Sequence, residues 1–103
     1  MTQSSTSTIE KEKIIDKLQE PGMYKVLFIN DDVTPMNFVV EVLITIFKHS
    51  QAKAEKITQE IHNSGSGIAG IYVYEIAEQK GVEVTVSARS SGYPLMVKIE
   101  PES

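Results

Sequence analysis

The chain has 103 residues and a mass of 11.4 kDa, which suits a single domain, because domains usually run to roughly 100–150 residues. It contains no cysteine, which excludes a disulfide framework, a thiolate zinc site and a cysteine nucleophile and fits a reducing compartment. The net charge is −4 and the lysines and arginines form no basic stripe, so nucleic acid is not an expected partner.

No segment of the sequence is suited to a membrane or to export. The longest apolar run, Val39 to Ile46, includes Glu41 and is far shorter than the roughly 20 residues that span a bilayer. The first eight residues are almost all Ser, Thr and Gln and lack the pattern of a secretory signal. We therefore expect no membrane partner and a cytoplasmic location.

The composition of residues 1–22 predicts a flexible extension ahead of one folded domain at residues 23–103. Ser, Thr and Gln bury little apolar surface, and fixing a backbone costs ~1–2 kcal/mol per residue. Residues 9–20 carry charges of both signs around three apolar positions, Ile14, Ile15 and Leu18. Their spacing allows one or two amphipathic helical turns before a Pro-Gly pair. From composition alone, the extension is a solvated terminus.

The domain begins with a strand and a helix. Residues 24–29 are mainly β-branched and aromatic, and turn-forming residues follow them. Thr34 stands before Pro35, so we expect the threonine hydroxyl to cap a helix that begins at the proline. Polar residues recur at helical steps as far as Lys48. They leave an apolar face made of Met36, Val39, Val40, Leu43, Ile46 and Phe47.

A second helix and a second strand come next. Ser50 suits a helix N-cap, and Gly65 suits the left-handed position that ends a helix. Between them, three apolar residues keep the helical period: Ala54, Ile57 and Ile61. Residues 68–74 are again β-branched and aromatic, which predicts a strand.

The local sequence pattern does not decide whether residues 75–91 form a strand or a helix. Residues 82–87 alternate like a strand, and Gly81 would act as a break before them. A helix fits equally well, because Ala77, Val84 and Ala88 fall on one helical face and Gly92 is a usual helix end.

Residues 94–100 alternate between apolar and polar positions, so the domain closes on a strand. With a helix in the ambiguous segment, the element order is βααβαβ. The predicted fold class is α+β, a small sandwich with three helices packed on one face of a three-stranded antiparallel sheet.

Few side chains suit catalysis. The only histidines are His49 and His62, and a serine, threonine or lysine nucleophile would need a base such as one of these. Asp31, Asp32 and His62 form the one set that a metal or a general base would use, although two carboxylates in a turn usually serve the turn itself. Taken alone, a histidine near a helix C-terminus interacts with the helix dipole. We expect no enzyme, no cofactor and no metal.

One stretch of sequence is distinctive. Residues 30–43 run Asn-Asp-Asp-Val-Thr-Pro-Met-Asn-Phe-Val-Val-Glu-Val-Leu at a strand-to-helix junction, and they resemble the signature of ClpS, the bacterial adaptor family of the N-degron pathway. The resemblance covers residues 23–100 and continues through Ile61-His62, Ala69-Gly70-Ile71, residues 75–80 and Tyr93-Pro94-Leu95. It implies that the ambiguous residues 75–91 form a helix, because tertiary packing overrides local propensity.

The resemblance implies a function of recognition without catalysis. Members of the family capture the free α-amino group and first side chain of polypeptides that begin with Leu, Phe, Tyr or Trp, and they deliver these to a ClpA-type AAA+ unfoldase of the Clp protease. An α-ammonium group donates three hydrogen bonds and carries one positive charge. Asn30, Asp31 and His62 match the positions that bind it, and Asp32 matches the pocket rim.

The first side chain needs an apolar pocket, where burial of a Leu- or Phe-sized group is worth ~1.5–3 kcal/mol. The residues that match the family's pocket positions are Thr34, Met36, Val39, Thr58, Ile61 and Leu95. Met36 matches a gatekeeper whose bulk rejects a branched β-carbon. Thr58 departs from the long apolar residue of many relatives, so we expect an enlarged or reshaped pocket floor.

The resemblance also implies partners. Glu75 and Lys80 match positions through which relatives contact the N-terminal domain of the unfoldase, although taken alone they suit a solvated helix face. In similar proteins the N-terminal extension is engaged by the unfoldase during substrate transfer. We expect a monomer that binds an N-degron polypeptide and a ClpA-type or ClpC-type unfoldase.

One other interaction module has the same element order. It is the C-terminal domain of the ribosomal stalk protein, which typically has lysine- and alanine-rich helices and a glycine-rich loop. This chain lacks those features.

Overall fold

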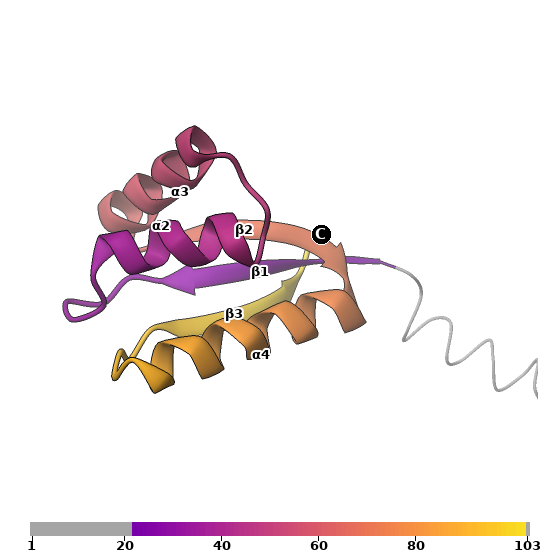
Figure 1. Cartoon of the computed structure of the whole chain (residues 1–103). Helices are drawn as coiled ribbons and strands as arrows, with labels where there is room; N and C mark the ends of the chain where they lie inside the picture. Colours follow the sequence, from indigo (N-terminus) through magenta and orange to yellow (C-terminus); the bar gives the residue numbers. More distant parts are fainter. Residues whose placement is uncertain (1–21, 103) are drawn as a thin grey trace, which may run out of the picture.

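The computed structural model describes residues 22–102, so the predicted extension lies outside the described residues except for Gly22. The elements are β1 (Met23–Ile29), α2 (Met36–Thr45), α3 (Gln51–Ser64), β2 (Ser66–Val73), α4 (Tyr74–Ser90) and β3 (Met96–Pro101). Their order confirms the predicted βααβαβ arrangement, with a helix in the segment that local pattern left open (Figure 1).

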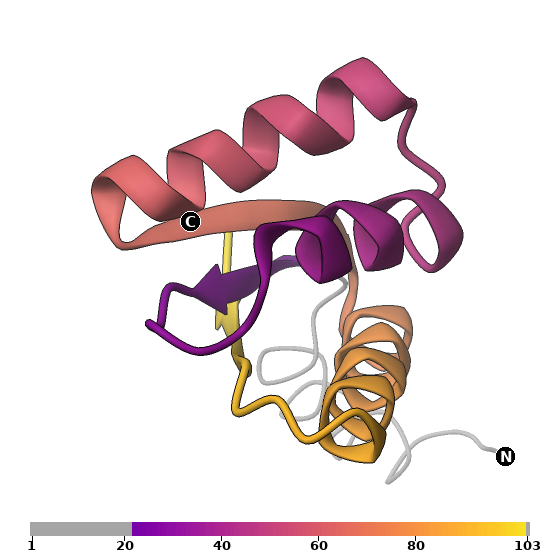
Figure 2. The ribbon, with the colours of Figure 1, turned by 60° about the vertical axis from the view of Figure 1, so that its left-hand side comes forward.

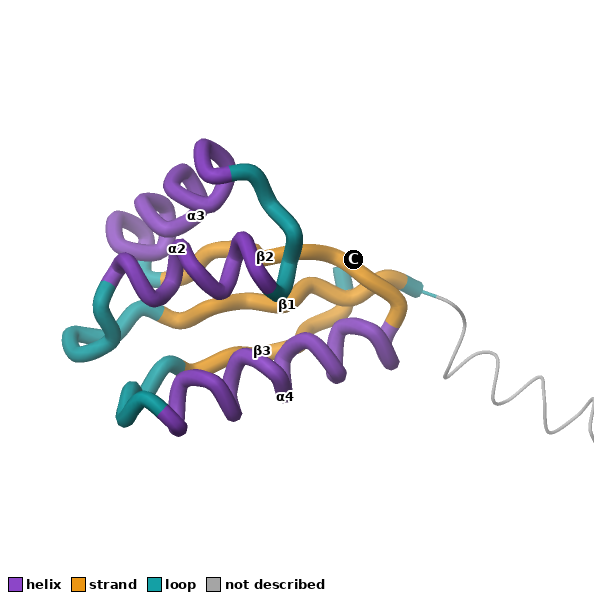
Figure 3. Tube along the Cα trace, in the orientation of Figure 1, coloured by secondary structure: helices purple, strands orange, loops and turns teal. Residues whose placement is uncertain are grey.

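The three strands form one antiparallel sheet in the order β2-β1-β3, which makes β1 the central strand (Figure 3). Phe28 of β1 is opposite Gly67 of β2 and Val97 of β3, and directly opposed residues share a face of the sheet. Gly67 lies against Ile61 of α3, and Val97 lies against Gly81 of α4. Both helices therefore cover the same face, as predicted.

The core lies between this face and the helices. Val26 and Phe28 of β1 are completely buried, whereas Lys25 and Leu27, which point the other way, are only partly buried. The helices contribute Val39, Val42, Leu43, Ala54, Ile57, Ile61, Ala77, Val84 and Ala88. Within the described part of the chain, no helix is long and apolar enough to cross a membrane.

The packing of α4 explains why a strand-like pattern forms a helix. Of its alternating valines, Val84 is fully buried, whereas Val82 and Val86 are 55% and 59% exposed. The buried positions Ala77, Gly81, Val84 and Ala88 follow steps of four, three and four residues, which is one helical face. Gly81 is therefore not a break. A Cβ atom at that position would lie 3.4 Å from Ile99 Cδ1, near ordinary contact distance, so Gly81 lies where α4 packs on β3.

The predicted cap of α2 is wrong. The helix begins at Met36 with Pro35 as its N-cap, and no side chain makes a cap hydrogen bond. The Thr34 hydroxyl instead donates to Oδ2 of Asp31 at 2.9 Å. The Thr34 hydroxyl is thus part of the Asp31 turn, where it donates to a charged acceptor.

The extent and the face of α2 also differ from the prediction. The helix ends at Thr45, and Lys48 has a φ of 61°, a left-handed conformation that ends helical geometry. Val42, which was not assigned to the apolar face, is only 3% exposed. Met36, which was assigned to it, is 43% exposed.

Both predicted caps of α3 are confirmed. The Lys53 N–H donates to Ser50 Oγ at 3.1 Å, and Gly65 is the C-cap with a φ of 94°. The Gly65 N–H donates to the Ile61 carbonyl oxygen at 2.9 Å. This closure fixes the last turn of α3, which carries His62.

Candidate functional site

The predicted site residues gather at one end of the sheet. Ile29, the last residue of β1, pairs with Ser66, the first residue of β2, and with Met96, the first residue of β3. Asn30 therefore lies between the chain segments that end at Gly65 and Leu95. The Asn30 N–H donates to the Gly65 carbonyl oxygen at 2.9 Å, which joins the end of β1 to the end of α3. Figures 1 and 2 show the β1–α2 loop, the end of α3 and the α4–β3 loop at this same end.

Asp31 organises the turn between β1 and α2. Its Oδ1 accepts hydrogen bonds from the Val33 N–H at 2.8 Å and the Thr34 N–H at 2.7 Å. Its Oδ2 accepts the Thr34 hydroxyl at 2.9 Å. Burial alone would raise the pKa of Asp31, but these hydrogen bonds and the nearby positive charge of Arg89 together hold the pKa below its ordinary value. The turn therefore keeps a fixed negative charge.

Three predicted polar residues stand exposed around this turn. Asn30, Asp32 and His62 are all exposed, and their side chains make no hydrogen bond to another residue of the range 22–102. Their amide, carboxylate and imidazole groups can therefore accept hydrogen bonds from a bound molecule. His62 also lies in the last turn of α3, where the helix dipole favours a basic group, so the two interpretations of this residue are compatible.

The predicted pocket residues range from the surface to the core. Met36 is 43% exposed and Thr34 is half-buried. Deeper positions are buried, and three of them belong to one hydrophobic cluster: Val39, Ile61 and Leu95. The exposed polar residues thus stand at the same end of the fold as these three residues of the buried core.

Thr58 is the one buried polar residue in the described part of the chain, at 4% exposure. Its hydroxyl donates to the Ala54 carbonyl oxygen at 2.8 Å, one turn earlier in α3. Because this hydrogen bond satisfies the hydroxyl, Thr58 is compatible with the surrounding apolar core.

Glu75 and Lys80, the predicted unfoldase contacts, do not share a helical face. Five residues of α helix separate them by ~140° around the axis. Glu75 is exposed, whereas the Lys80 Nζ donates to the Ile46 carbonyl oxygen at 2.9 Å. The same ammonium group lies 5.8 Å from the ring centroid of Phe47 and 5.4 Å from that of Tyr72. Lys80 therefore has a structural role inside the domain.

A metal site is not supported at the turn. The Asp31 oxygens accept three hydrogen bonds from the turn itself, so they are poorly placed to bind a cation as well. Within residues 22–102, no three His, Cys, Asp or Glu side chains group closely enough to hold a metal ion.

Sequence reasoning missed Arg89. In the last turn of α4, its Nη1 donates to the carbonyl oxygens of Tyr93 at 3.0 Å and of Leu95 at 2.9 Å. Arg89 thus holds the loop that presents Leu95. The available signal was a basic residue in the last turn of a helix, four residues before the Tyr-Pro-Leu motif.

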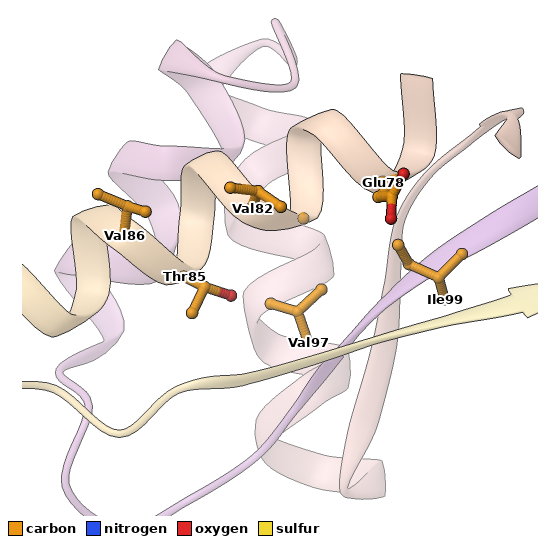
Figure 4. A pocket seen from close by; sticks show the side chains of 7 residues that line it. Glu78, Val82, Thr85, Val86, Val97 and Ile99 are labelled. Carbon is orange, nitrogen blue, oxygen red and sulfur yellow. The ribbon is translucent and has the colours of Figure 1, made fainter. Parts of the chain in front are cut away.

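A separate apolar groove lies between α4 and β3 (Figure 4). Its lining includes Val82, Thr85 and Val86 of α4 and Val97 and Ile99 of β3. None of the predicted site residues lines this groove, although Glu78 at its end follows Glu75 by one helical turn.

Comparison with known proteins decides between the two resemblances. The family model described as "ATP-dependent Clp protease adaptor protein ClpS" matches residues 19–98. The ATP-dependent Clp protease adapter protein ClpS of Campylobacter jejuni strain 81-176 is 47% identical, over 94% of this chain and 97% of the relative. The protein of the same name from Treponema denticola is 45% identical, over 95% of this chain and 93% of the relative.

A solved structure also matches. It is that of Agrobacterium tumefaciens ClpS2 bound to L-phenylalaninamide, with a TM-score of 0.77, 38% sequence identity, and coverage of 80% of this chain and 99% of that chain. Matches over nearly the whole length in sequence and over the domain in structure establish the relationship. The chain therefore belongs to the ClpS family, whose members are non-catalytic adaptors of the ATP-dependent Clp protease.

Proposed function

We propose that this adaptor binds the free α-amino group and the bulky hydrophobic first residue (Leu, Phe, Tyr or Trp) of N-degron substrates at the β1–α2 turn. It then delivers them to a ClpA-type AAA+ unfoldase of the Clp protease. The observation that carries the proposal is the pairing of Ile29 with Ser66 and Met96, which brings Asn30, the last turn of α3 and Leu95 together. The relative bound to L-phenylalaninamide supports it, because that ligand combines a free amine with an aromatic side chain.

The amine half of the proposed site meets the chemical needs of an α-ammonium group. The Asn30 side-chain carbonyl and a neutral nitrogen of His62 accept two of its three hydrogen bonds. Asp31 supplies a negative charge that the turn's own hydrogen bonds keep ionised. Acetylation of the amine removes the charge and two of the donors, so it should abolish binding.

In the proposal, the first side chain of the substrate enters a pocket formed by buried apolar residues. In the proposal, Val39, Ile61 and Leu95 form the apolar walls, and the methyl group of Thr58 contributes to the floor. Met36 and Thr34 stand at the entrance, and the bulk of Met36 excludes Ile and Val as first residues. A bulky side chain that enters gains ~1.5–3 kcal/mol from burial.

The proposed partner is the N-terminal domain of a ClpA-type or ClpC-type unfoldase, and one adaptor molecule acts alone in the bacterial cytoplasm. Exposed Glu75 on α4 is the proposed contact. Lys80 takes part through its hold on the end of α2. The N-terminal extension serves as the segment that the unfoldase engages. Glu75→Lys should weaken binding to the isolated N-terminal domain in solution without a change in peptide affinity, whereas unaltered binding would remove Glu75 from the contact.

The decisive experiment is fluorescence anisotropy with labelled decapeptides that differ only at the first residue. The set comprises Leu, Phe, Tyr, Trp, Ile and Met, together with Nα-acetyl-Leu. Micromolar or tighter binding is expected for Leu and the aromatic residues, with loss on acetylation and in His62→Ala. The matched control is Asn63→Ala, which truncates the exposed neighbouring residue in the same turn of α3. If no free amine binds better than its acetylated twin, the proposed site is wrong.

A further inference from the structure

The α4–β3 loop is held in two different ways. The first is a backbone motif at the end of α4, in which the Gly92 N–H donates to the Arg89 carbonyl at 3.0 Å and the Tyr93 N–H donates to the Ala88 carbonyl at 2.8 Å. Gly92 has a φ of 81°, and this pattern is the Schellman closure of a helix. The closure fixes the chain as far as Tyr93.

Leu95 lies beyond the reach of that closure. Pro94 has no N–H to donate, and β3 begins only at Met96. The side chain of Arg89 spans this gap, because its Nη1 donates both to the Tyr93 carbonyl at 3.0 Å and to the Leu95 carbonyl at 2.9 Å. Leu95 is 1% exposed, so its side chain is packed where this clamp holds its backbone.

The ring of Tyr93 links the same loop to α2. It meets the ring of Phe38 edge-on, with centroids 5.0 Å apart. Phe38 and the proposed pocket residue Val39 are neighbours in the first turn of α2, which begins at Met36. A shift of the loop would therefore displace Leu95, a proposed wall residue. Through the contact between Tyr93 and Phe38, it would also displace α2, which carries the proposed wall residue Val39.

We propose that Arg89 is a positioning residue for substrate selection, which sets the place of the Leu95 wall relative to the β1–α2 turn by clamping the two loop carbonyls. The inference rests on the proposed function, because it assigns Leu95 to the pocket. Arg89 itself does not touch the substrate in this proposal. Its effect on binding passes through the loop.

Loss of the Arg89 charge and loss of its hydrogen bonds to the loop should have opposite effects on peptide affinity. The guanidinium charge is close enough to Asp31 to lower the pKa of its carboxyl group. A positive charge there also opposes a bound α-ammonium group, so loss of the charge alone should strengthen binding of the free amine. Loss of the clamp should instead weaken binding, because the apolar wall no longer has one fixed position.

The test compares Arg89→Gln and Arg89→Lys with the wild type, using the peptides that begin with Leu, Phe, Tyr and Trp. Glutamine removes the charge and the fork of donors, whereas lysine keeps the charge and a flexible donor. We expect affinity to fall in the order wild type, lysine, glutamine, with a loss of about tenfold for Arg89→Gln. The spread of affinities among the four first residues should narrow. Lys53→Gln, which removes an exposed positive charge near the other end of α3, should change neither quantity.

Three outcomes overturn the inference. Tighter binding by Arg89→Gln means that the residue acts through charge alone, and an equal loss for all four peptides means that no wall was displaced. If Arg89→Gln does not fold, as judged by circular dichroism, Arg89→Lys carries the comparison. Nα-acetyl-Leu separates this inference from the proposed function. If the wild type binds the free amine better than its acetylated twin while the Arg89 variants match the wild type, only the role of Arg89 fails.

Discussion

The ammonium group of Lys80 on α4 lies 2.9 Å from the carbonyl oxygen of Ile46, the C-cap residue of α2. The last carbonyl groups of a helix lack partners within the helix, and a cation there also interacts favourably with the helix dipole. The rings of Phe47 and Tyr72 lie beside the same ammonium group. One side chain thus joins the end of α2 to α4 and β2.

This contact predicts that Lys80 contributes to stability. Lys80→Met keeps much of the side-chain volume but removes the charge, the hydrogen bond and the cation–π contacts. A hydrogen bond to a charged group contributes ~1.5–3 kcal/mol, so the free energy of unfolding should fall by an amount within that range. Urea denaturation followed by circular dichroism measures it.

Glu75→Gln is the matched control, because it neutralises an exposed charge on the same helix. Its free energy of unfolding should stay within about 0.5 kcal/mol of the wild type. Equal stability of Lys80→Met and the wild type would show that the Lys80 contact is energetically unimportant, and a role limited to the unfoldase contact would then explain the residue better.

The hydrogen bonds of Asp31 predict a stability loss in acid. Burial acts to raise the pKa of Asp31, but its hydrogen bonds with Thr34 and Val33 and the charge of Arg89 lower it below the ordinary value of 3.8. A lowered folded-state pKa means that the ionised group stabilises the fold above the unfolded-state value and that this stabilisation is lost as the pH falls through the folded-state value. The affected window is therefore at and below pH 3.8.

Asp31→Asn tests this window, because asparagine keeps the shape but does not ionise. The wild type should be more stable than the variant at pH 7, and the difference should shrink as the pH falls below 3.8. Denaturation at a series of pH values gives the two curves. Asp32→Asn, which changes an exposed residue of the same turn, serves as the control. The free energy of unfolding of this variant should change with pH in parallel with that of the wild type. If the difference in free energy of unfolding between Asp31→Asn and the wild type were the same at every pH, ionised Asp31 would not stabilise the fold in this way.

Most of the fold could be predicted because its signals are local. The caps of α3 at Ser50 and Gly65 depend on residues close in sequence, and both were predicted correctly. The predicted Thr34 cap is wrong because Thr34 belongs to the preceding turn, where its hydroxyl donates to Asp31, and the helix begins only at Met36. The local pattern does not show that Asp31 and Thr34 form one hydrogen-bonded turn ahead of the helix.

The proposed site rests on the family resemblance, because local pattern alone does not assemble it. Periodicity places Asn30 at a strand end and His62 near a helix end, but it gives no register between the strands, and the register is what brings these ends together. Arg89 was missed for a related reason. Its partners are backbone carbonyls of a loop, and any residue type can supply a carbonyl, so a basic residue at a helix end does not reveal which groups it binds.

The satisfied hydroxyl of Thr58 yields a prediction about the floor of the proposed pocket. Thr58→Val removes the hydroxyl but keeps the branched shape, and the Ala54 carbonyl still has its helical partner. Peptide affinity should change by less than about twofold, because threonine and valine have nearly the same shape. Thr58→Met adds volume at a position that is 4% exposed, so it should destabilise the fold by ~1–3 kcal/mol and weaken binding of Trp more than binding of Leu.

Anisotropy titrations with the Leu and Trp peptides measure both variants. The ratio of the two affinities is the informative quantity, because a general loss of folded protein lowers both alike. An unchanged ratio in Thr58→Met would place residue 58 away from the bound side chain, whatever its effect on stability.

Gly67 of β2 and Gly81 of α4 both lie between the sheet and the helices. We expect an added methyl group to have opposite effects at these two positions. A Cβ atom on Gly67 would lie 2.7 Å from Ile61 Cγ1, which is closer than carbon atoms approach. Ile61 must then move, and it is both a core residue and a proposed pocket wall. Gly67→Ala should therefore lower the free energy of unfolding by ~1–3 kcal/mol and weaken peptide binding together.

Gly81→Ala is the matched control, because its Cβ atom would meet methyl groups of Ile99 and Val97 at 3.4 Å and 3.5 Å, near ordinary contact distance. Alanine in place of a mid-helix glycine favours the helix by ~0.5–1 kcal/mol, so this variant should be as stable as the wild type or more so. Because α4 packs here on β3, away from Ile61, peptide affinity should not change. Full binding by Gly67→Ala would separate Ile61 from the proposed pocket, whereas weakened binding by Gly81→Ala would show that packing between α4 and β3 also affects the peptide site.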